Sequence, residues 1–313
     1  MNLAQELNDW GPEALANRPK PPTLQESQAY CKRLSRSNYE NFVVVGVFTP
    51  PALRPAFEAI YGYCRWADDL GDETGSIETS SKLLRWWLQQ LDSIYQINPA
   101  APPAHPVFIA LKPVVEQFQI PIKPFQDLVS AFQQDQVVTH YKTHKQLVDY
   151  CERSANPVGE LVLRLFHAAT PENLILSNDI CTALQLANFW QDVARDLDKN
   201  RVYLPSETLA NFGLNEADLA QKPASPEFRE MLAEQVAQTR AMFQRGYPLT
   251  KNLNGRARLA IKLFHDGGVA TLDAIESVNY DVLTKRPKVG KIKQLKMMIK
   301  ILSESLIRSR SLR

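Results

Sequence analysis

The chain has 313 residues, of which 44% are hydrophobic, so it is long enough for one large domain or two ordinary ones. Its formal net charge is only +2, which argues against a general nucleic-acid-binding protein. The four cysteines, Cys31, Cys64, Cys151 and Cys181, are widely spaced without a CxxC pair, as expected for reduced thiols in a cytoplasmic protein.

The beginning of the sequence has neither a basic segment nor an apolar segment of the signal-peptide type, so no signal peptide is expected. Residues 1–23 are polar and contain four prolines, which predicts a flexible N-terminal arm. Thr23 is a candidate N-cap because Glu26 follows three residues later, and a helix is expected to begin there. The apolar run VVVGVF (43–48) fits a strand by composition alone.

Residues 54–73 are predicted to form a helix with an unusual acidic side. Tyr61, Arg65, Asp68, Asp69 and Asp72 share this side, and apolar residues occupy much of the remaining surface. A helix that is apolar over most of its circumference is usually buried, and buried carboxylates are rare unless they are paired or bound to metal.

Further helices are predicted over residues 78–96, 107–118, 124–138 and 145–167. Pro157 is expected to kink the last of these helices. The small residues Ala155 and Gly159 beside it indicate tight helix packing.

A second acidic helix is predicted within residues 185–205. Helical spacing places Gln185, Asn188, Asp192, Asp196 and Lys199 in one narrow arc. This arc is either a solvated face or a cation site, and its short oxygen-bearing side chains suit Mg²⁺, which binds carboxylates together with substrate phosphates.

The four-residue spacing of Asp192 and Asp196 repeats that of Asp68 and Asp72. If the two helices face each other, they form a site for Mg²⁺ ions and a diphosphate. Arg201 and Tyr203 follow the second helix, and they suit either diphosphate oxygens or an ordinary surface arginine and core tyrosine.

The remaining chain is predicted to contain an irregular connection at 206–225 and helices at 226–249 and 253–280. From Lys285 to Arg313 the sequence has ten Lys or Arg residues and one Glu. A basic amphipathic helix is predicted at 291–313, which either lies on a membrane surface or packs on the protein. Since no sustained Val/Ile/Thr alternation occurs, the expected fold class is all-α.

Several motifs resemble the squalene/phytoene synthases. They are SNYENF (37–42), YGYCRWADDLGDE (61–73), SANPVG (154–159), NFWQDVARDL (188–197), NRVYLP (200–205) and the RP pair at Arg286 and Pro287. The paired aspartate motifs are highly specific when they occur together. The resemblance covers nearly the whole chain and is closest to the bacterial hydroxysqualene synthase branch.

The resemblance implies a single-domain isoprenoid-synthase bundle around a central cavity, over residues 24–290. It also makes the run at 43–48 helical. The implied catalytic residues are Asp68, Asp72, Asp192 and Asp196, with Arg65 assisting. The implied Mg²⁺ ligands are these four aspartates and Asn188. The implied substrate-binding residues are Ser37, Tyr39, Tyr61, Asp69, Gly159, Gln185, Asn188, Arg201, Tyr203 and Tyr280.

The implied reaction converts presqualene diphosphate to hydroxysqualene with release of diphosphate. It needs Mg²⁺ but no NADPH, and the sequence has no Gly-rich dinucleotide fingerprint. The implied pathway partner is a presqualene diphosphate synthase, and the enzyme is expected to be cytoplasmic with peripheral binding to the anionic inner membrane. The alternatives are a head-to-head prenyl transferase that makes presqualene diphosphate, squalene or phytoene, and a non-catalytic membrane-associated assembly or lipid-binding protein.

Overall fold

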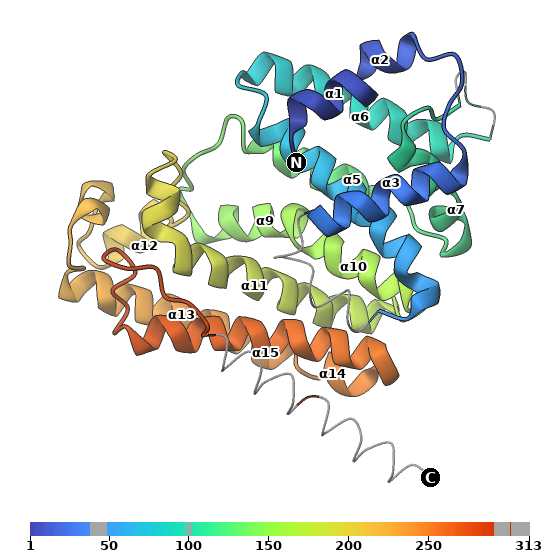
Figure 1. Cartoon of the computed structure of the whole chain (residues 1–313). Helices are drawn as coiled ribbons and strands as arrows, with labels where there is room; N and C mark the ends of the chain where they lie inside the picture. The colour runs from blue at the N-terminus through green and yellow to red at the C-terminus, as the bar shows by residue number, and fades with distance from the viewer. Residues whose placement is uncertain (38–48, 98, 100–101, 291–300, 302–313) are drawn as a thin grey trace, which may run out of the picture. The chain divides into compact units, whose positions relative to one another are not determined.

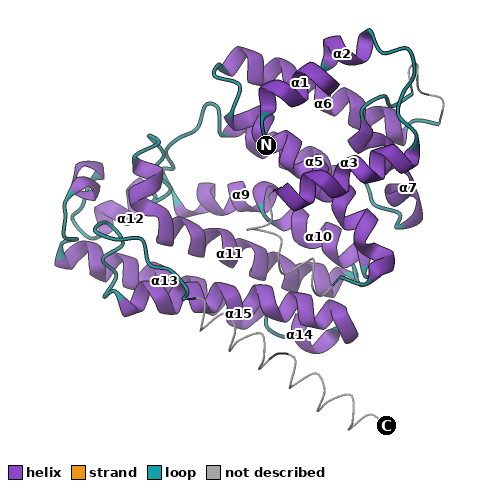
Figure 2. Cartoon of the chain, viewed as in Figure 1, coloured by secondary structure: helices purple, strands orange, loops and turns teal. Residues whose placement is uncertain are grey.

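The computed structural model describes residues 1–37, 49–97, 99, 102–290 and 301 (Figure 1). Among these residues the regular structure is helical, as Figure 2 shows, and one isolated parallel bridge joins His140 to Val202. The all-α class predicted from the sequence is therefore confirmed. The expected central cavity stays a prediction.

The chain divides into two compact units. Unit 1 contains Met1–Val137 and Glu160–Ala169, and unit 2 contains Val138–Gly159 and Thr170–Arg313. The expectation that residues 24–290 form a single domain stays a prediction.

Unit 1 is built around helix α5 (Arg54–Asp72), which carries the first acidic motif. This helix packs against α3 (Leu24–Ser37), α6 (Ile77–Tyr95), α7 (Pro106–Gln117) and α8 (Lys123–Gln134), and the short 3₁₀ helix η2 (Pro51–Leu53) precedes it. The predicted start of α3 is confirmed, because the Thr23 N–H donates to Glu26 at 2.8 Å and the Glu26 N–H donates to Thr23 Oγ1 at 3.3 Å.

Aromatic packing fixes α5 in place. Trp66 is fully buried and stacks on Trp87 of α6, with ring centroids 5.3 Å apart and an interplanar angle of 13°. Tyr63 packs edge-on against Phe125 of α8 and donates to the Phe125 carbonyl at 2.9 Å. Because these side chains lock one side of α5 into the core, the direction of its opposite, acidic side is fixed as well.

The N-terminal arm contains two helices that its composition did not predict. Helix α1 (Leu3–Trp10) is capped by Asn2, and α2 (Pro12–Ala16) begins at Pro12, since the first helical position tolerates proline. Leu3 is buried, and Trp10 packs edge-on against Tyr30 of α3. Proline therefore begins a helix here, whereas the sequence prediction treated it only as a sign of irregular chain.

Unit 2 is built around α11 (Pro171–Leu197), which carries the second acidic motif. Helix α11 packs against α13 (Pro226–Gly246), α15 (Gly255–Ser277), α9 (His144–Ser154) and α14 (Leu249–Asn252). Trp190 of α11 is fully buried and donates to Thr239 Oγ1 of α13 at 2.8 Å. This packing orients the acidic arc of α11 by the same means as in unit 1.

Three predicted boundaries were wrong. The helix expected at 145–167 is two helices, α9 and α10 (Asn156–Leu165), separated at Ala155, because Pro157 fits the first turn of a new helix better than a helix interior. Helix α11 begins at Pro171 after the N-cap Thr170. The connection at 206–225 contains α12 (Ser206–Asn211) and the 3₁₀ helix η3 (Glu216–Ala220).

Some predictions concern residues outside the described part of the chain. They are Tyr39, the apolar run at 43–48 and nearly all of the basic helix at 291–313. Within the described residues, no helix combines the length and the apolar character that crossing a membrane requires.

Candidate active site

The first acidic motif presents two of its aspartates to solvent and buries the third. Asp72 is exposed and Asp68 keeps 43% of its side chain accessible, whereas only 2% of the Asp69 side chain is accessible. Asp68 and Asp72 lie one helical turn apart on α5, as their spacing predicted. The pair expected to bind metal is therefore accessible, and Asp69 lies on the protein side of the helix.

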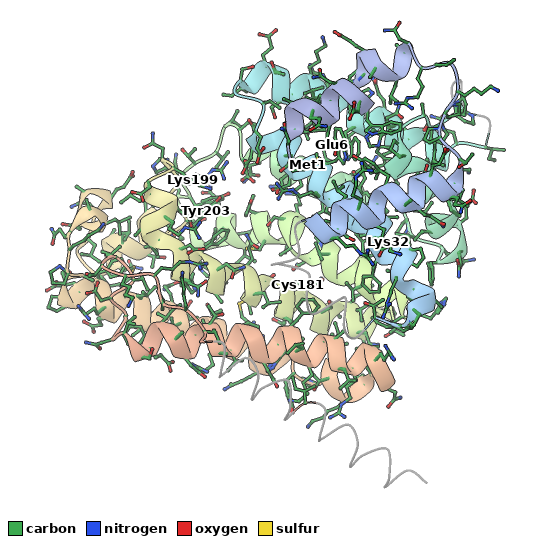
Figure 3. All side chains as sticks on the ribbon, in the orientation of Figure 1. Met1, Glu6, Lys32, Cys181, Lys199 and Tyr203 are labelled. Carbon is green, nitrogen blue, oxygen red and sulfur yellow. The ribbon has the colours of Figure 1, made fainter. Side chains whose placement is uncertain are left out.

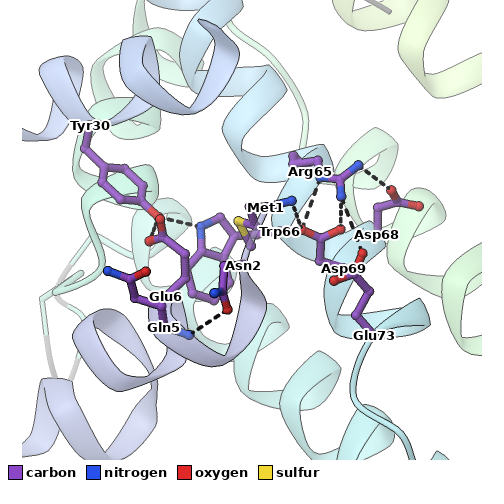
Figure 4. A network of polar contacts seen from close by, with 10 residues as sticks. All are labelled: Met1, Asn2, Gln5, Glu6, Tyr30, Arg65, Trp66, Asp68, Asp69 and Glu73. Carbon is purple, nitrogen blue, oxygen red and sulfur yellow. Dashed lines mark hydrogen bonds and ion pairs between the residues drawn. The ribbon is translucent and has the colours of Figure 1, made fainter. Parts of the chain in front are cut away.

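Arg65 lies between Asp68 and the buried Asp69 (Figure 4). Its Nε donates to Asp69 Oδ2 at 3.1 Å and its Nη2 pairs closely with Asp69 Oδ1, which makes a two-pronged ion pair. Its Nη1 lies 3.4 Å from Asp68 Oδ2. Tyr61, one turn before Arg65, is also buried, and burial raises the pKa of its hydroxyl.

The surroundings of Asp68 disfavour its charged form, which a bound cation would stabilise. Removal from water raises the pKa of Asp68 to about 6, and the nearby charges of Asp72, Asp69 and Glu73 add to this effect while Arg65 opposes it. Solvent still reaches 43% of the side chain, so it screens part of this repulsion. A bound cation would favour the ionised form, and protons compete with it at acidic pH.

The second acidic motif is already in contact with a cation, Arg286. Arg286 Nη2 donates to Asp192 Oδ2 at 2.9 Å and to Gln191 Oε1 at 3.0 Å, and its Nε pairs closely with Asp192 Oδ1. Gln191 in turn donates to the Pro287 carbonyl at 2.8 Å, which fixes the loop after α15 against α11. The family resemblance in the sequence included the RP pair at Arg286 and Pro287, but it did not assign Arg286 to the site.

Asp196 lies one turn beyond Asp192 and is surrounded by basic residues. Removal from water and the charge of Asp192 raise the pKa of Asp196 to about 6, while Lys199, Arg201 and Arg195 act in the opposite direction. Asp196, Arg201 and Tyr203 also line one small pocket, together with apolar side chains such as Phe189, Val193 and Leu219. The structure therefore brings together three of the residues predicted for this site.

The segment after α11 folds back so that Arg201 reaches Asp196. Asn200 has a φ of 59°, a left-handed conformation that Asn adopts more readily than most residues. After this reversal the Arg201 N–H donates to the Asp196 carbonyl at 2.9 Å, and the Val202 N–H donates to the Thr139 carbonyl at 2.8 Å. Figure 3 shows Lys199 and Tyr203 on this segment.

Tyr203 is held in an aromatic cluster. Its ring stacks on Phe189 of α11 with centroids 3.8 Å apart and an interplanar angle of 9°, and Tyr141 and Tyr150 lie beside it. Tyr203 lines the pocket and also packs against three aromatic rings. Its packing therefore anchors the segment that carries Arg201.

The other predicted residues occupy different positions in unit 2. Gln185 is half-buried and Asn188 is exposed, and both lie on α11. Asn188 is about one turn after Gln185 and one turn before Asp192. Tyr280 lies in the turn after α15 with a φ of 59°. The contact from this end of the chain to Asp192 comes six residues later, from Arg286.

Gly159 is needed for close helix packing. A Cβ at this position would lie 2.4 Å from Ser177 Oγ and 2.5 Å from Cys181 Sγ, both on α11. Only glycine therefore permits α10 to approach α11 this closely, in agreement with the packing interpretation of the sequence. In unit 1, Ser37 is the last residue of α3.

The two acidic pairs fit Mg²⁺ with a phosphate ligand better than a metal held by protein alone. In the part of the chain that the structure describes, no group of three or more His, Cys, Asp or Glu side chains could enclose a metal ion. Mg²⁺ typically takes one or two carboxylates and fills its other positions with water and substrate phosphates. Each acidic helix offers two such carboxylates, and the pKa of one of them, Asp68 or Asp196, is raised. This arrangement matches the requirement of Mg²⁺.

Comparison with known proteins agrees with this geometry. The chain is 37% identical to the squalene synthase HpnC from Alicyclobacillus acidocaldarius, whose crystal structure superposes with a TM-score of 0.77 and covers 82% of this chain and 96% of that one. It is also 30% identical to the phytoene synthase of Arthrospira platensis over 88% of this chain and 92% of the relative, and 28% identical to the 15-cis-phytoene synthase of a Synechocystis strain over 91% and 89%.

The sequence model of one family, described as squalene/phytoene synthase, matches residues 35–293. The match includes both acidic helices and Arg286. The chain belongs to the squalene/phytoene synthase family.

Proposed function

We propose that this protein is a Mg²⁺-dependent enzyme that converts presqualene diphosphate to hydroxysqualene and releases diphosphate. The observation that carries the proposal is the pair of accessible aspartates, one turn apart, on each of two helices whose orientation is fixed by a buried tryptophan. Asp68 and Asp72 of α5, and Asn188, Asp192 and Asp196 of α11, would hold Mg²⁺, which would supply Lewis-acid stabilisation of the leaving diphosphate.

The two motifs differ in charge, and this difference suggests different tasks. Around the first motif, Asp68, Asp69, Asp72 and Glu73 outnumber Arg65, so this motif favours cations. Around the second motif, Arg195, Lys199, Arg201 and Arg286 accompany Asp192 and Asp196. A motif that combines carboxylates with several basic side chains suits a diphosphate that arrives with metal ions. The carboxylates can bind the metal ions, and the basic side chains can bind the phosphate oxygens.

Arginine is the appropriate residue for the phosphate side of this task. Its planar guanidinium offers two parallel donors to phosphate oxygens and stays charged at any physiological pH. Arg201 beside Asp196 and Arg286 beside Asp192 can therefore orient the diphosphate and stabilise the negative charge that develops as it leaves. Tyr203 supports Arg201 by anchoring its segment.

A second candidate function is the head-to-head joining of two prenyl diphosphates to presqualene diphosphate, squalene or phytoene. The identity to phytoene synthases over about nine-tenths of the chain supports it. The similarity to a squalene synthase over a comparable length supports the squalene branch, within which we place the hydroxysqualene reaction. The acidic pairs, complete in both motifs, argue against a non-catalytic lipid-binding or assembly protein.

The product formed from presqualene diphosphate distinguishes these candidates. We expect purified protein with Mg²⁺ and without NADPH to release an alcohol, because a water molecule captures the product cation when no hydride donor is present. In isotopically labelled water the label should appear in the hydroxyl group, as mass spectrometry would detect. A hydrocarbon product, or an alcohol without the label, would contradict the hydroxysqualene assignment.

The proposed setting is the cytoplasm, beside a presqualene diphosphate synthase that supplies the substrate. Presqualene diphosphate has a long apolar part that favours residence in a bilayer, so an enzyme acting on it meets its substrate at the membrane surface. The basic residues of 291–313 would attract anionic headgroups, each by about 1 kcal/mol near the surface. Peripheral binding to the inner membrane is thus part of the proposal.

A further inference from the structure

The buried aspartate of the first motif contacts Arg65 and is directed away from solvent. Asp69 and Asp68 are neighbours in the sequence, but 2% of the Asp69 side chain is accessible compared with 43% of Asp68. A carboxylate with so little accessible surface is poorly placed to bind a soluble ligand directly. Its effect on a ligand must therefore pass through the groups that it contacts.

Asp69 has cationic partners in this environment. Both of its oxygens pair with the Arg65 guanidinium, and the amino group of Met1 lies 3.2 Å from its Oδ2. Burial raises the pKa of Asp69, but both cations act in the opposite direction and favour the charged carboxylate. The two-pronged contact fixes the plane of the guanidinium, because Nε and Nη2 are both engaged on one edge.

Met1, just before α1, lies beside this ion pair, as Figure 4 shows. Glu6 of α1 accepts a hydrogen bond from the Tyr30 hydroxyl at 2.7 Å, and the Tyr30 hydroxyl accepts from Trp66 Nε1 at 2.8 Å. Trp66 directly follows Arg65 on α5. The contacts of α1 thus reach the same turn of α5 that carries the Arg65–Asp69 pair.

The edge of Arg65 that Asp69 does not occupy is the one directed towards Asp68. Arg65 Nη1 lies 3.4 Å from Asp68 Oδ2, a longer contact than those to Asp69, and 22% of the arginine side chain is accessible. A phosphate oxygen bound near Asp68 could therefore accept a hydrogen bond from this edge while the opposite edge stays paired.

We infer that Asp69 is a positioning residue, which holds the Arg65 guanidinium so that its other edge, the one that contacts Asp68, binds a diphosphate oxygen. This inference rests on the proposed function, since it assigns a task within the same site. It changes the role that the sequence predicted for Asp69, from direct substrate binding to support of a residue that binds.

Calorimetric binding of inorganic diphosphate in Mg²⁺ buffer tests the inference without any turnover. At saturating Mg²⁺ we expect Asp69→Asn to weaken diphosphate binding by about 10-fold, in line with the loss of other supporting contacts around bound ligands. The weakening should persist as Mg²⁺ is raised. Asp68→Asn should respond differently, because added Mg²⁺ should restore much of its binding if Asp68 is a metal ligand.

A double-mutant cycle identifies the route of the effect. If Asp69 acts through Arg65, the variant with both Arg65→Gln and Asp69→Asn should bind diphosphate as weakly as Arg65→Gln alone. The double variant removes both charges of the Arg65–Asp69 pair, so only the Met1 amino group loses its partner, and the comparison with Arg65→Gln does not need Asp69→Asn alone to fold. Additive losses in the double variant would overturn the inference.

Asp127→Asn is a matched control, because Asp127 on α8 also pairs with a basic residue four positions away, Lys123, at 2.6 Å. It should bind diphosphate like the wild type. If the wild type binds diphosphate and Asp69→Asn binds equally well, the inference alone fails. If the wild type does not bind diphosphate in Mg²⁺, the proposed function fails and the inference with it.

Discussion

Asp68→Asn or Asp192→Asn should reduce turnover of a prenyl diphosphate by about 10²–10³-fold or more, the usual cost of removing one group that stabilises developing charge in an enzyme. Each change replaces a charged carboxylate that we propose as a metal ligand by a neutral amide of nearly the same shape. Because the side chains of Asp68 and Asp192 keep 43% and 21% of their surface accessible and the amide has nearly the same shape, the fold should tolerate the change. Steady-state assays of diphosphate release would measure the loss.

Circular dichroism provides the folding control for these two variants, and their helical signal should equal that of the wild type. Asp149→Asn is a matched control for the loss of one carboxylate, since Asp149 pairs with Lys145 on α9, keeps 46% of its side chain accessible and lies outside both motifs. Wild-type turnover in Asp68→Asn or Asp192→Asn would show that the acidic pairs do not bind the catalytic metal.

Arg286→Ala should lower kcat/KM for a prenyl diphosphate by about 10- to 100-fold, an effect of the size seen when a supporting contact around a metal ligand is removed. The change removes the two-pronged partner of Asp192 and leaves Asp192 and Asp196, one turn apart, with less compensating charge. It also removes one arginine that we propose for the diphosphate. Steady-state kinetics over a range of substrate concentrations would measure it.

Arg286→Lys should recover only part of the loss, because lysine keeps the charge but lacks the planar fork. Lys285→Ala, which removes the exposed neighbouring charge, should behave like the wild type. Unchanged kinetics in Arg286→Ala, with an unchanged melting temperature, would mean that this loop contributes nothing to the site.

Local periodicity was sufficient to predict which aspartates lie one turn apart on each acidic helix, although not that the pair on α5 is accessible. Residues four apart on a helix share a face whatever the rest of the protein does, so Asp68 with Asp72 and Asp192 with Asp196 could be paired from the sequence. The start of α3 was also predictable, because the reciprocal contacts of Thr23 and Glu26 span only three residues.

Features that depend on tertiary contacts could not be predicted in this way. The helical wheel placed Asp69 on the same side as Asp68, but only the structure shows that Asp69 is buried and pairs with both Met1 and Arg65. Arg286 meets Asp192 across 94 residues of sequence, a separation over which periodicity carries no information. The sequence suggested tight packing at Gly159, and the structure identified Ser177 and Cys181 as its neighbours.

Two boundary errors had local causes that the sequence already contained. Thr170 followed by Pro171 and Glu172 is a typical beginning of a helix, which predicts the observed start of α11. Asn215 and Asp218 form a reciprocal cap that begins η3 within the segment expected to be irregular. Both capping motifs span only a few residues. The polar or proline-containing sequence beside each of them is typical of a loop, so a loop was predicted.

The most direct test of the account is diphosphate release from presqualene diphosphate and, separately, from farnesyl diphosphate, measured with Mg²⁺, with a chelator, and after Mg²⁺ is restored. We expect release from presqualene diphosphate that stops with the chelator and returns with Mg²⁺. Release that continues without any divalent cation, or no release from either substrate in Mg²⁺, would contradict metal-dependent prenyl diphosphate chemistry in this protein.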